Sequence, residues 1–195
     1  QNTKSVEAGI DLGFFNGRIT ANYTFSRQDV KDQIFAVPMA SSTGYSQKVT
    51  NAGKVHTNAH ELTLGFIPVQ TKDFSWDLNF TFTKNNSKIV ELSDLVADRI
   101  VLQGNVDYGN YRIGSVAQVG GTYGMLMTDS AMKIDPESGL GVMTYADGYG
   151  TAIYLRSGEV QEIGNSVPDF LSSVTTSFRW KNFSLSISLD GRFGG

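Results

Sequence analysis

Strict alternation of apolar and polar side chains is the feature of this sequence that most limits its fold. In GRITANYTFS (residues 17–26), apolar residues take every second position and polar residues fill the positions between them. A side-chain period of two is typical of a β-strand with one apolar and one polar face. Five further segments alternate in the same way. We therefore expect six strands, near residues 5–13, 18–27, 58–68, 74–84, 171–180 and 183–191.

The connections between these expected strands have two very different lengths. Asn16-Gly17, VQTKD (residues 69–73) and Lys181-Asn182 are short, so the six strands form three hairpins. The other two connections are long, near residues 28–57 and 85–169. Loops beyond about 12–15 residues are uncommon in compact soluble domains. Short turns at one end of the strands and long loops at the other are typical of outer-membrane β-barrels.

Strand length and aromatic placement also favour a membrane. About ten residues at roughly 3.3 Å each, tilted near 40°, rise about 25 Å, the height of the apolar band of a transmembrane β-barrel. Aromatic residues gather beside the short turns, as an interfacial girdle requires, at Phe14, Phe15, Phe74, Trp76, Trp180 and Phe183. We expect the apolar row to face lipid. Its residues are Ile19, Tyr23, Leu62, Leu64, Trp76, Leu78, Phe80, Phe178, Leu185 and Ile187.

The opposite faces of these strands are too polar for the core of a sandwich and suit a hydrated lumen. They carry Glu7, Asp11, Glu61, Asp77, Asn79 and Arg179. Six strands do not close a barrel, because the smallest natural barrels have about eight. Left open, such a sheet exposes two unpaired edges. We therefore expect residues 1–195 to be part of a larger antiparallel transmembrane β-barrel.

Composition excludes several functions. The 195-residue chain has a formal net charge of −3 and a pI near 5.3, so it has no basic field for nucleic acid. It has no cysteine, which removes disulfides, thiolate metal sites and cysteine nucleophiles. No apolar run approaches the roughly 18–20 residues of a membrane helix. The chain opens at Gln1 without a secretory signal, so we expect a processed protein or a piece of one.

The sequence also lacks the common signatures of catalysis and of cofactor binding, and we expect neither an enzyme nor a cofactor. His56 and His60 share one face of a strand but lie about 13 Å apart by strand rise, too far to hold one metal ion. DPESG (residues 135–139) carries two carboxylates. Proline in the second position makes this segment ordinary turn chemistry rather than a metal site.

Several longer phrases of the sequence resemble one known family. They are EAGIDLGFFNGRITANYTFS (7–26), STGY (42–45), NAGKVHTNAHELTLGF (51–66), DFSWDLNFTFTKNNSKI (73–89) and GNSVPDFLSSVTTSFRWKNFSLSISLDGRFGG (164–195). Together and in this order they resemble the SusC/RagA family of TonB-dependent outer-membrane transporters. The resemblance implies a 22-stranded barrel with an N-terminal plug in the outer membrane of a Gram-negative cell. It also implies import of oligosaccharides or peptides, a SusD-like lipoprotein lid and coupling to the TonB complex.

The resemblance covers only part of that family's architecture. The plug, the TonB box and the closing strand of the barrel have no counterpart here, so the chain is expected to be an interior segment of the barrel's second half. One departure concerns His60-Glu61, where the family commonly has glycine before the glutamate. A bulkier residue therefore lies on the lipid-facing row, near its outer rim.

Seven of the eight tyrosines lie in the two long connections. A tyrosine ring offers a flat apolar face with a polar tip, which suits stacking on sugars or gripping peptides. The same rings also pack large loops together, and we favour that role for most of them. Candidates for contact with the substrate or with the lid are Tyr108, Tyr111, Arg112, Tyr123, Tyr145 and Tyr149.

Two other interpretations stay open at this point. A soluble β-sandwich that binds carbohydrate shows the same alternation, with its polar face outward. A passive porin-like barrel has the same strands but no plug in the parent gene. Our leading expectation is a segment of an energy-coupled importer in contact with outer-membrane lipid, with oligosaccharides ahead of peptides as its cargo.

Overall fold

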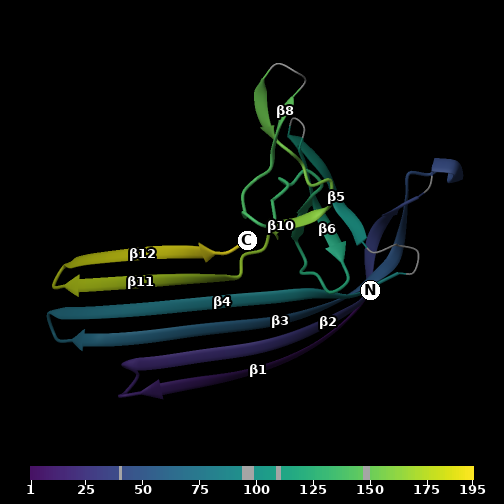
Figure 1. Ribbon diagram of the computed structural model, residues 1–195. Helices are drawn as coiled ribbons and strands as arrows, with labels where there is room; N and C mark the ends of the chain where they lie inside the picture. Colours follow the sequence, from purple (N-terminus) through teal and green to yellow (C-terminus); the bar gives the residue numbers. More distant parts are fainter. Residues whose placement is uncertain (40, 94–98, 109–110, 147–149) are drawn as a thin grey trace.

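The computed structural model describes residues 1–39, 41–93, 99–108, 111–146 and 150–195. Its main part is one antiparallel sheet of six strands in the order β1-β2-β3-β4-β11-β12 (Figure 1). These strands are β1 (Asn2–Phe14), β2 (Ile19–Pro38), β3 (Gln47–Gln70), β4 (Phe74–Leu92), β11 (Phe170–Trp180) and β12 (Phe183–Phe193). The expected all-β, antiparallel fold is confirmed. In the described part of the chain, no helix has the length and apolar character that a membrane span requires.

Three short turns close the hairpins at one end of this sheet, which we call the turn end. Phe15 and Asn16 have φ of 53° and 56°, and Gly17 has φ of 82°, so three left-handed residues reverse the chain between β1 and β2. Lys181, with φ of 51°, makes the two-residue turn between β11 and β12. The Lys181 amide also donates to the Asp73 carbonyl, at 2.8 Å, which ties two neighbouring turns together.

The strands β2, β3 and β4 are much longer than the sequence pattern predicted. They have 20, 24 and 19 residues, whereas the alternation predicted about ten for each. The predicted loop at 28–57 is therefore wrong in its bounds: only Met39–Ser46, with the short 3-10 turn η1 (Ser41–Thr43), joins β2 to β3. The predicted loop at 85–169 likewise contains the end of β4 and six further strands.

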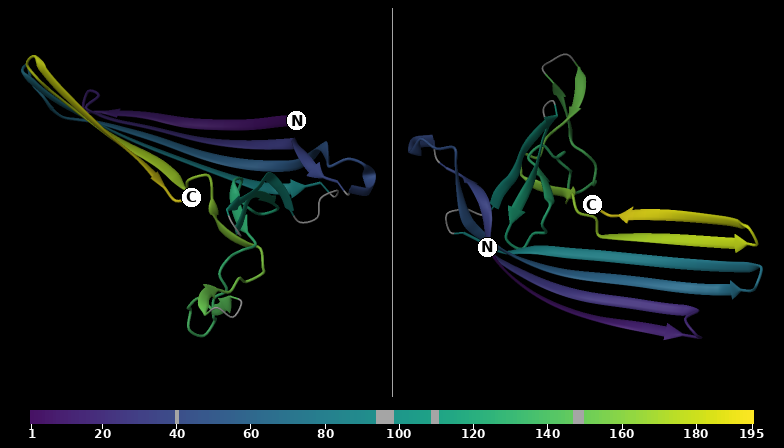
Figure 2. Two further views of the ribbon diagram at one scale, coloured as in Figure 1. Left: turned by 90° about the horizontal axis from the view of Figure 1, so that it is seen from above. Right: turned by 180° about the vertical axis from the view of Figure 1, so that it is seen from behind.

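Those six strands form two small sheets at the end opposite the turns, which we call the loop end (Figure 2). One sheet has the order β10-β7-β6-β5, and the other is the hairpin β8-β9. The bounds are β5 (Arg99–Tyr108), β6 (Tyr111–Gln118), β7 (Met125–Thr128), β8 (Met143–Ala146), β9 (Thr151–Tyr154) and β10 (Gln161–Asn165). The hairpin β8-β9 projects away from the rest of the chain (Figures 1 and 2).

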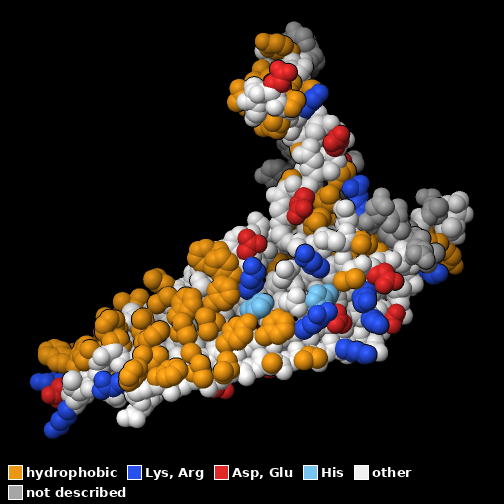
Figure 3. All heavy atoms as spheres, turned by 60° about the horizontal axis from the view of Figure 1, so that its bottom comes forward, with side chains coloured by type: hydrophobic (Ala, Val, Ile, Leu, Met, Phe, Trp, Pro, Cys, Tyr) orange, Lys and Arg blue, Asp and Glu red, His pale blue; other side chains and the backbone are white. Residues whose placement is uncertain are grey.

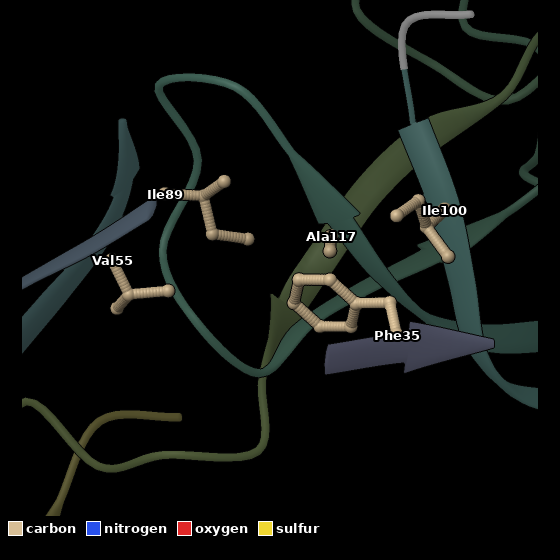
Figure 4. Packing of buried hydrophobic residues seen from close by; sticks show 5 residues of the cluster. All are labelled: Phe35, Val55, Ile89, Ile100 and Ala117. Carbon is tan, nitrogen blue, oxygen red and sulfur yellow. The ribbon is translucent and has the colours of Figure 1, made fainter. Parts of the chain in front are cut away.

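A small apolar core lies at the loop end, between the extended strands and the four-stranded sheet. Phe35, Val55 and Ile89 come from β2, β3 and β4, and Ile100 and Ala117 come from β5 and β6 (Figure 4). Ile89 and Ile100 are each only 1% exposed. Burying an isoleucine side chain contributes about 1.5–3 kcal/mol. This core therefore gives the long connection a fixed structure.

The edge of β4 also holds the four-stranded sheet in place. β11 pairs with β4 only over residues 74–83, so the next part of β4 has a free edge. The segment between β6 and β7 fills it: the Tyr123 amide donates to the Ser87 carbonyl at 3.0 Å, and the Ile89 amide donates to the Gly121 carbonyl at 3.0 Å. The edge is thus covered where a long unpaired edge would invite aggregation.

Candidate functional site

The register of the six-stranded sheet places its apolar residues on a single face. Residues directly opposite one another on paired strands point to the same side. One row crosses all six strands: Leu12, Ala21, Leu64, Phe80, Val174 and Leu189. The ten residues predicted to face lipid all lie on this side, which we call the outer face. The other side of the same sheet is the inner face.

The outer face is not covered by any described part of the chain. Ile10, Leu185 and Leu189 are 52%, 57% and 70% exposed. Figure 3 shows hydrophobic side chains gathered in one continuous area over the turn-end part of the sheet. A sandwich would bury this surface beneath a second sheet. The soluble-sandwich interpretation therefore has no support in the described structure.

Aromatic rings mark the turn end of the outer face. Trp180 stacks on Phe183 across β11 and β12, with ring centroids 6.4 Å apart, and the Lys181 ammonium lies 5.8 Å from the Trp180 ring centroid. Trp76 stacks on Phe178 at 5.6 Å. The Trp76 indole also donates to the Thr176 hydroxyl at 2.9 Å, which satisfies a polar group within an apolar row. Such amphipathic rings suit a membrane interface.

His60 lies at the loop-end limit of the apolar rows. Its Nδ1 is 2.8 Å from the Tyr23 hydroxyl oxygen, and its ring centroid is 5.1 Å from that of Phe25. The register puts Lys84 beside it on β4. The histidine that departs from the family pattern thus has both a polar and an aromatic partner. It occupies the row where the outer face changes from apolar to charged.

The inner face is lined mainly by hydroxyl groups that pair across strands. Thr81 bonds Ser173 at 2.7 Å, and Ser177 bonds Ser186 at 2.9 Å. The amide of Asn22 donates to the Asp11 carboxylate on the neighbouring strand. A surface of paired polar groups is suited to contact with water or with a polar solute.

At the loop end, the four-stranded sheet covers the continuation of this inner face. Val30, Val55 and Ile89 are cross-strand partners at inner-face positions, and they pack with the buried residues of β5 and β6. The long connection therefore folds over the inner side of the sheet. It does not fold over the side that carries the apolar rows.

The predicted contact residues of the long connection do not come together in one site. Tyr123 lies beside β4 and is 39% exposed, whereas Tyr145 lies on β8 and is 73% exposed. Tyr108 and Tyr111 are paired at the ends of β5 and β6, with Arg112 next in register; their side chains lie outside the described part of the structure. Tyr149 lies outside the described residues. A contact role for these six residues stays a prediction.

The sequence pattern missed an apolar surface on and beside the β8-β9 hairpin. Met143 and Tyr154 are opposite one another and share a face of the hairpin with Tyr145; they are 54%, 58% and 73% exposed. Ile153 lies on the other face and is 45% exposed, and Leu140, just before β8, is 69% exposed. These segments are too short for a period-two pattern to stand out. Apolar residues in and just before a short hairpin were the available signal, since exposed apolar patches commonly mark interaction surfaces.

The acidic segment at residues 135–139 forms a turn, as expected. The Ser138 hydroxyl donates to Asp135 at 2.6 Å, and the Gly139 amide donates to the Asp135 carbonyl at 2.9 Å. The hydrogen bond from Ser138, followed by that from the Glu137 amide, lowers the pKa of Asp135. Among the described residues, no group of three or more His, Cys, Asp or Glu side chains is placed to hold a metal ion.

Comparison with solved structures supports the fold. The chain is similar to the RagAB peptide importer in its closed-closed state, with a TM-score of 0.70 and 18% identity over 98% of this chain and 21% of that one. It is also similar to the open-open state, with a TM-score of 0.68 and 19% identity over 98% and 20% of the two chains.

Sequence comparison gives the family. The TonB-dependent receptor SusC of Bacteroides thetaiotaomicron is 27% identical over 97% of this chain and 19% of its own length. The TonB-dependent receptor P3 of Formosa agariphila is 23% identical over 100% of this chain and 20% of its own length. The chain thus spans about a fifth of these relatives. The family described as TonB dependent receptor-like, beta-barrel, matches residues 1–190, and the chain belongs to this family of outer-membrane receptors and transporters, which are not enzymes.

Proposed function

We propose that this chain supplies wall and extracellular loops to a TonB-dependent importer of oligosaccharides. The observation that carries the proposal is the division of one sheet into an uncovered apolar face and a hydroxyl-lined polar face. In a barrel, the first face meets outer-membrane lipid and the second meets the solute path. The turn end then lies at the periplasm and the loop end outside the cell.

Oligosaccharides are the proposed cargo, with peptides as the second candidate. The paired serines and threonines of β4, β11 and β12 present neutral hydroxyl groups, which suit an uncharged, polyhydroxylated solute. The sequence similarity to SusC supports this choice. The fold similarity to the RagAB peptide importer supports the second candidate.

We further propose that a SusD-like lipoprotein covers the loop end and contacts the β8-β9 hairpin. The supporting observation is the exposed face of the hairpin that carries Met143, Tyr145 and Tyr154. Tyrosines on an exposed hairpin suit such a contact, because each ring buries a large area at low entropy cost. The plug and the TonB contact belong to parts of the parent protein beyond this chain.

Uptake by the full-length protein tests the importer proposal. Cells that express it should take up a labelled oligosaccharide, and removing TonB should abolish that uptake. A labelled oligopeptide of similar mass separates the two candidate cargoes. Uptake that persists at the same rate without TonB contradicts the proposal and supports a passive porin.

The lid contact needs a separate measurement. Met143→Asp with Tyr145→Asp places charge on the one face of the hairpin that carries Met143, Tyr145 and Tyr154, and it should weaken co-purification of the lipoprotein with the full-length protein. Lys133→Glu, on an exposed residue of the same long connection, is the matched control and should leave co-purification unchanged. Equal retention of the lipoprotein in both variants would contradict the contact.

A further inference from the structure

Positive charge gathers on the outer face immediately above the apolar rows. Phe82 ends the apolar row of β4, and the next outward positions on that strand are Lys84, Asn86 and Lys88. Arg27 on β2 lies on the same face, and so does Lys4 on β1, which is directly opposite Asp29 of β2. Figure 3 shows Lys and Arg side chains beside the hydrophobic area, with the two histidines at the border. Strand rise and spacing put these cations within a patch of roughly 14 Å by 13 Å.

The inner face at the same height has the opposite charge. Its positions in these rows include Glu7 and Glu61 and no cation. The positive charge is therefore a property of one face and not of the whole loop end. A surface needed only for solubility in water would have no reason to separate the two signs in this way.

The carboxylate of Asp29, on β2 within the outer patch, is already paired. Asp29 lies 2.8 Å from Nδ1 of His56 and 3.6 Å from Nε of Arg27. Within the part of the chain that the structure describes, Lys4, Lys84 and Lys88 have no acidic side chain within 4 Å. All three lysines are exposed. The patch thus keeps three cations for an external anion.

Two of these lysines line a cleft beside β4. It has a volume of about 230 Å³ and lies between β4 and the segment that links β10 to β11. Lys84, Asn86 and Lys88 line it from the outer side of β4, and Asn85 and Ser87 from the inner side. Tyr123, Asn165 and Asp169 complete the lining at this edge of the sheet. Two ammonium groups, several hydrogen-bond donors and the single carboxylate of Asp169 therefore surround a space next to the apolar rows, and positive charge predominates in it.

We propose that this cleft and the adjoining cations bind phosphate groups on the headgroups of outer-leaflet lipids. Lys84 lies two residues beyond Phe82, where the apolar outer row of β4 ends, so its ammonium reaches the headgroup level while its stem stays along the apolar surface. The solute path is on the other face of the sheet. The proposal therefore adds a lipid site to the outer wall, and it depends on the outer-membrane location and not on the cargo.

Lipid binding by the full-length protein tests this site. The protein is placed in nanodiscs of zwitterionic phosphatidylcholine, and binding of diphosphorylated lipid A is measured for wild type and for Lys84→Gln with Lys88→Gln. A cation near an anionic membrane contributes a factor of about five in affinity, so the double variant should bind about 25-fold more weakly. Lys72→Gln with Lys181→Gln removes the same charge at the turn end and should bind as wild type does.

Two further arms identify the chemistry. Enzymatically dephosphorylated lipid A should bind wild type and the double variant equally. Inorganic phosphate at millimolar concentration should not displace lipid A, since the lipid is also held by its acyl chains. Heat-modifiable gel mobility establishes that each variant is folded before binding is compared.

Three results would overturn the proposal. One is lipid A binding by the folded double variant at wild-type strength. Another is an equal loss of binding in the turn-end control. The third is complete displacement of lipid A by inorganic phosphate, which would make the cleft a site for soluble phosphate.

Discussion

The strands β2, β3 and β4 place their apolar side chains on opposite faces in their two halves. Towards the turn end, Leu62, Leu64 and Phe80 lie on the outer face, and the inner face is polar. Towards the loop end, Val55 and Ile89 lie on the inner face, and the outer face is charged. The change occurs within a few residues of His60 and Lys84, without a break in β3 or β4.

The contrast shows that the face carrying the apolar side chains depends on what surrounds each half of the strands. In the first half, the outer face is apolar and is not covered by the described residues, which fits contact with lipid, and the inner face is polar. In the second half, the outer face is charged and exposed, and the four-stranded sheet covers the inner face. Antiparallel pairing of β2 with β3 and of β3 with β4 continues through both halves, with register shifts near Asp32 and Lys54 at the loop end. The two halves therefore share one pattern of strand pairing and differ in which face of the sheet carries the apolar side chains.

The most severe expected effect, loss of barrel assembly, comes from charge on the outer face of the first half. Leu64→Arg in the full-length protein should cost about 2–4 kcal/mol near the middle of the bilayer and block assembly. Thr63→Arg, one residue away on the inner face, should assemble normally because its side chain reaches water. Heat-modifiable gel mobility measures assembly. Equal tolerance of both variants would contradict the assignment of the two faces.

In the second half, the sensitive face should be the inner one. Ile89 is 1% exposed, so Ile89→Ala should cost about 2–5 kcal/mol of local stability in the packing of the four-stranded sheet. The neighbouring Lys88→Ala, on the exposed outer face, should leave this packing unchanged.

Limited proteolysis of the full-length protein measures this effect. Cleavage within residues 99–165 should become faster in Ile89→Ala, while the barrel itself stays intact on gels. Unchanged cleavage in Ile89→Ala would mean that the core at the loop end does not hold the long connection in place.

The same change of face explains how far the sequence predicted the structure. Six strands, three hairpins and a common apolar face follow from uninterrupted alternation, and the register bears this out. The predicted strands end near residues 27, 58 and 84, where the apolar residues leave the outer face. Beyond these points the pattern becomes polar on both faces for several residues. Alternation then gives no signal, although the backbone pairing continues.

The long connection was less predictable for a different reason. Its core brings Phe35 and Val55 together with Ile100 and Ala117, which lie at least 45 residues further along the chain. No local pattern encodes such contacts. The many tyrosines drew attention to this connection, but their number does not tell which of them are exposed. In the structure Tyr145 is 73% exposed and Tyr123 is 39% exposed.

A smaller effect is expected at the border between the two halves. Tyr23→Phe removes the hydroxyl that lies 2.8 Å from Nδ1 of His60, and it should cost about 0.5–1.5 kcal/mol. Adding His60→Leu should recover much of that loss, because no polar ring is then left without its partner. Urea unfolding of the refolded full-length protein in detergent measures the free energy of unfolding of wild type, of each single variant and of the double variant. Additive losses in the double variant would mean that the two side chains are not coupled.

The smallest effect is expected far from the membrane, in the turn at Asp135. The hydrogen bond from Ser138 lowers the pKa of this carboxyl group, so the turn gains stability above the ordinary aspartate pKa and loses it as the pH falls through the lowered value. Ser138→Ala should raise the pKa of Asp135 towards its usual range and move the loss of the turn to higher pH.

Deuterium exchange at Gly139, whose amide bonds the Asp135 carbonyl, measures this loss when it is corrected for the intrinsic rate at each pH. Glu137→Gln is the matched control, because it removes a neighbouring charge and keeps the backbone amide that also bonds Asp135. If Ser138→Ala and wild type opened at the same pH, the hydroxyl would not be what holds the turn, and the effect would belong to the backbone amide alone.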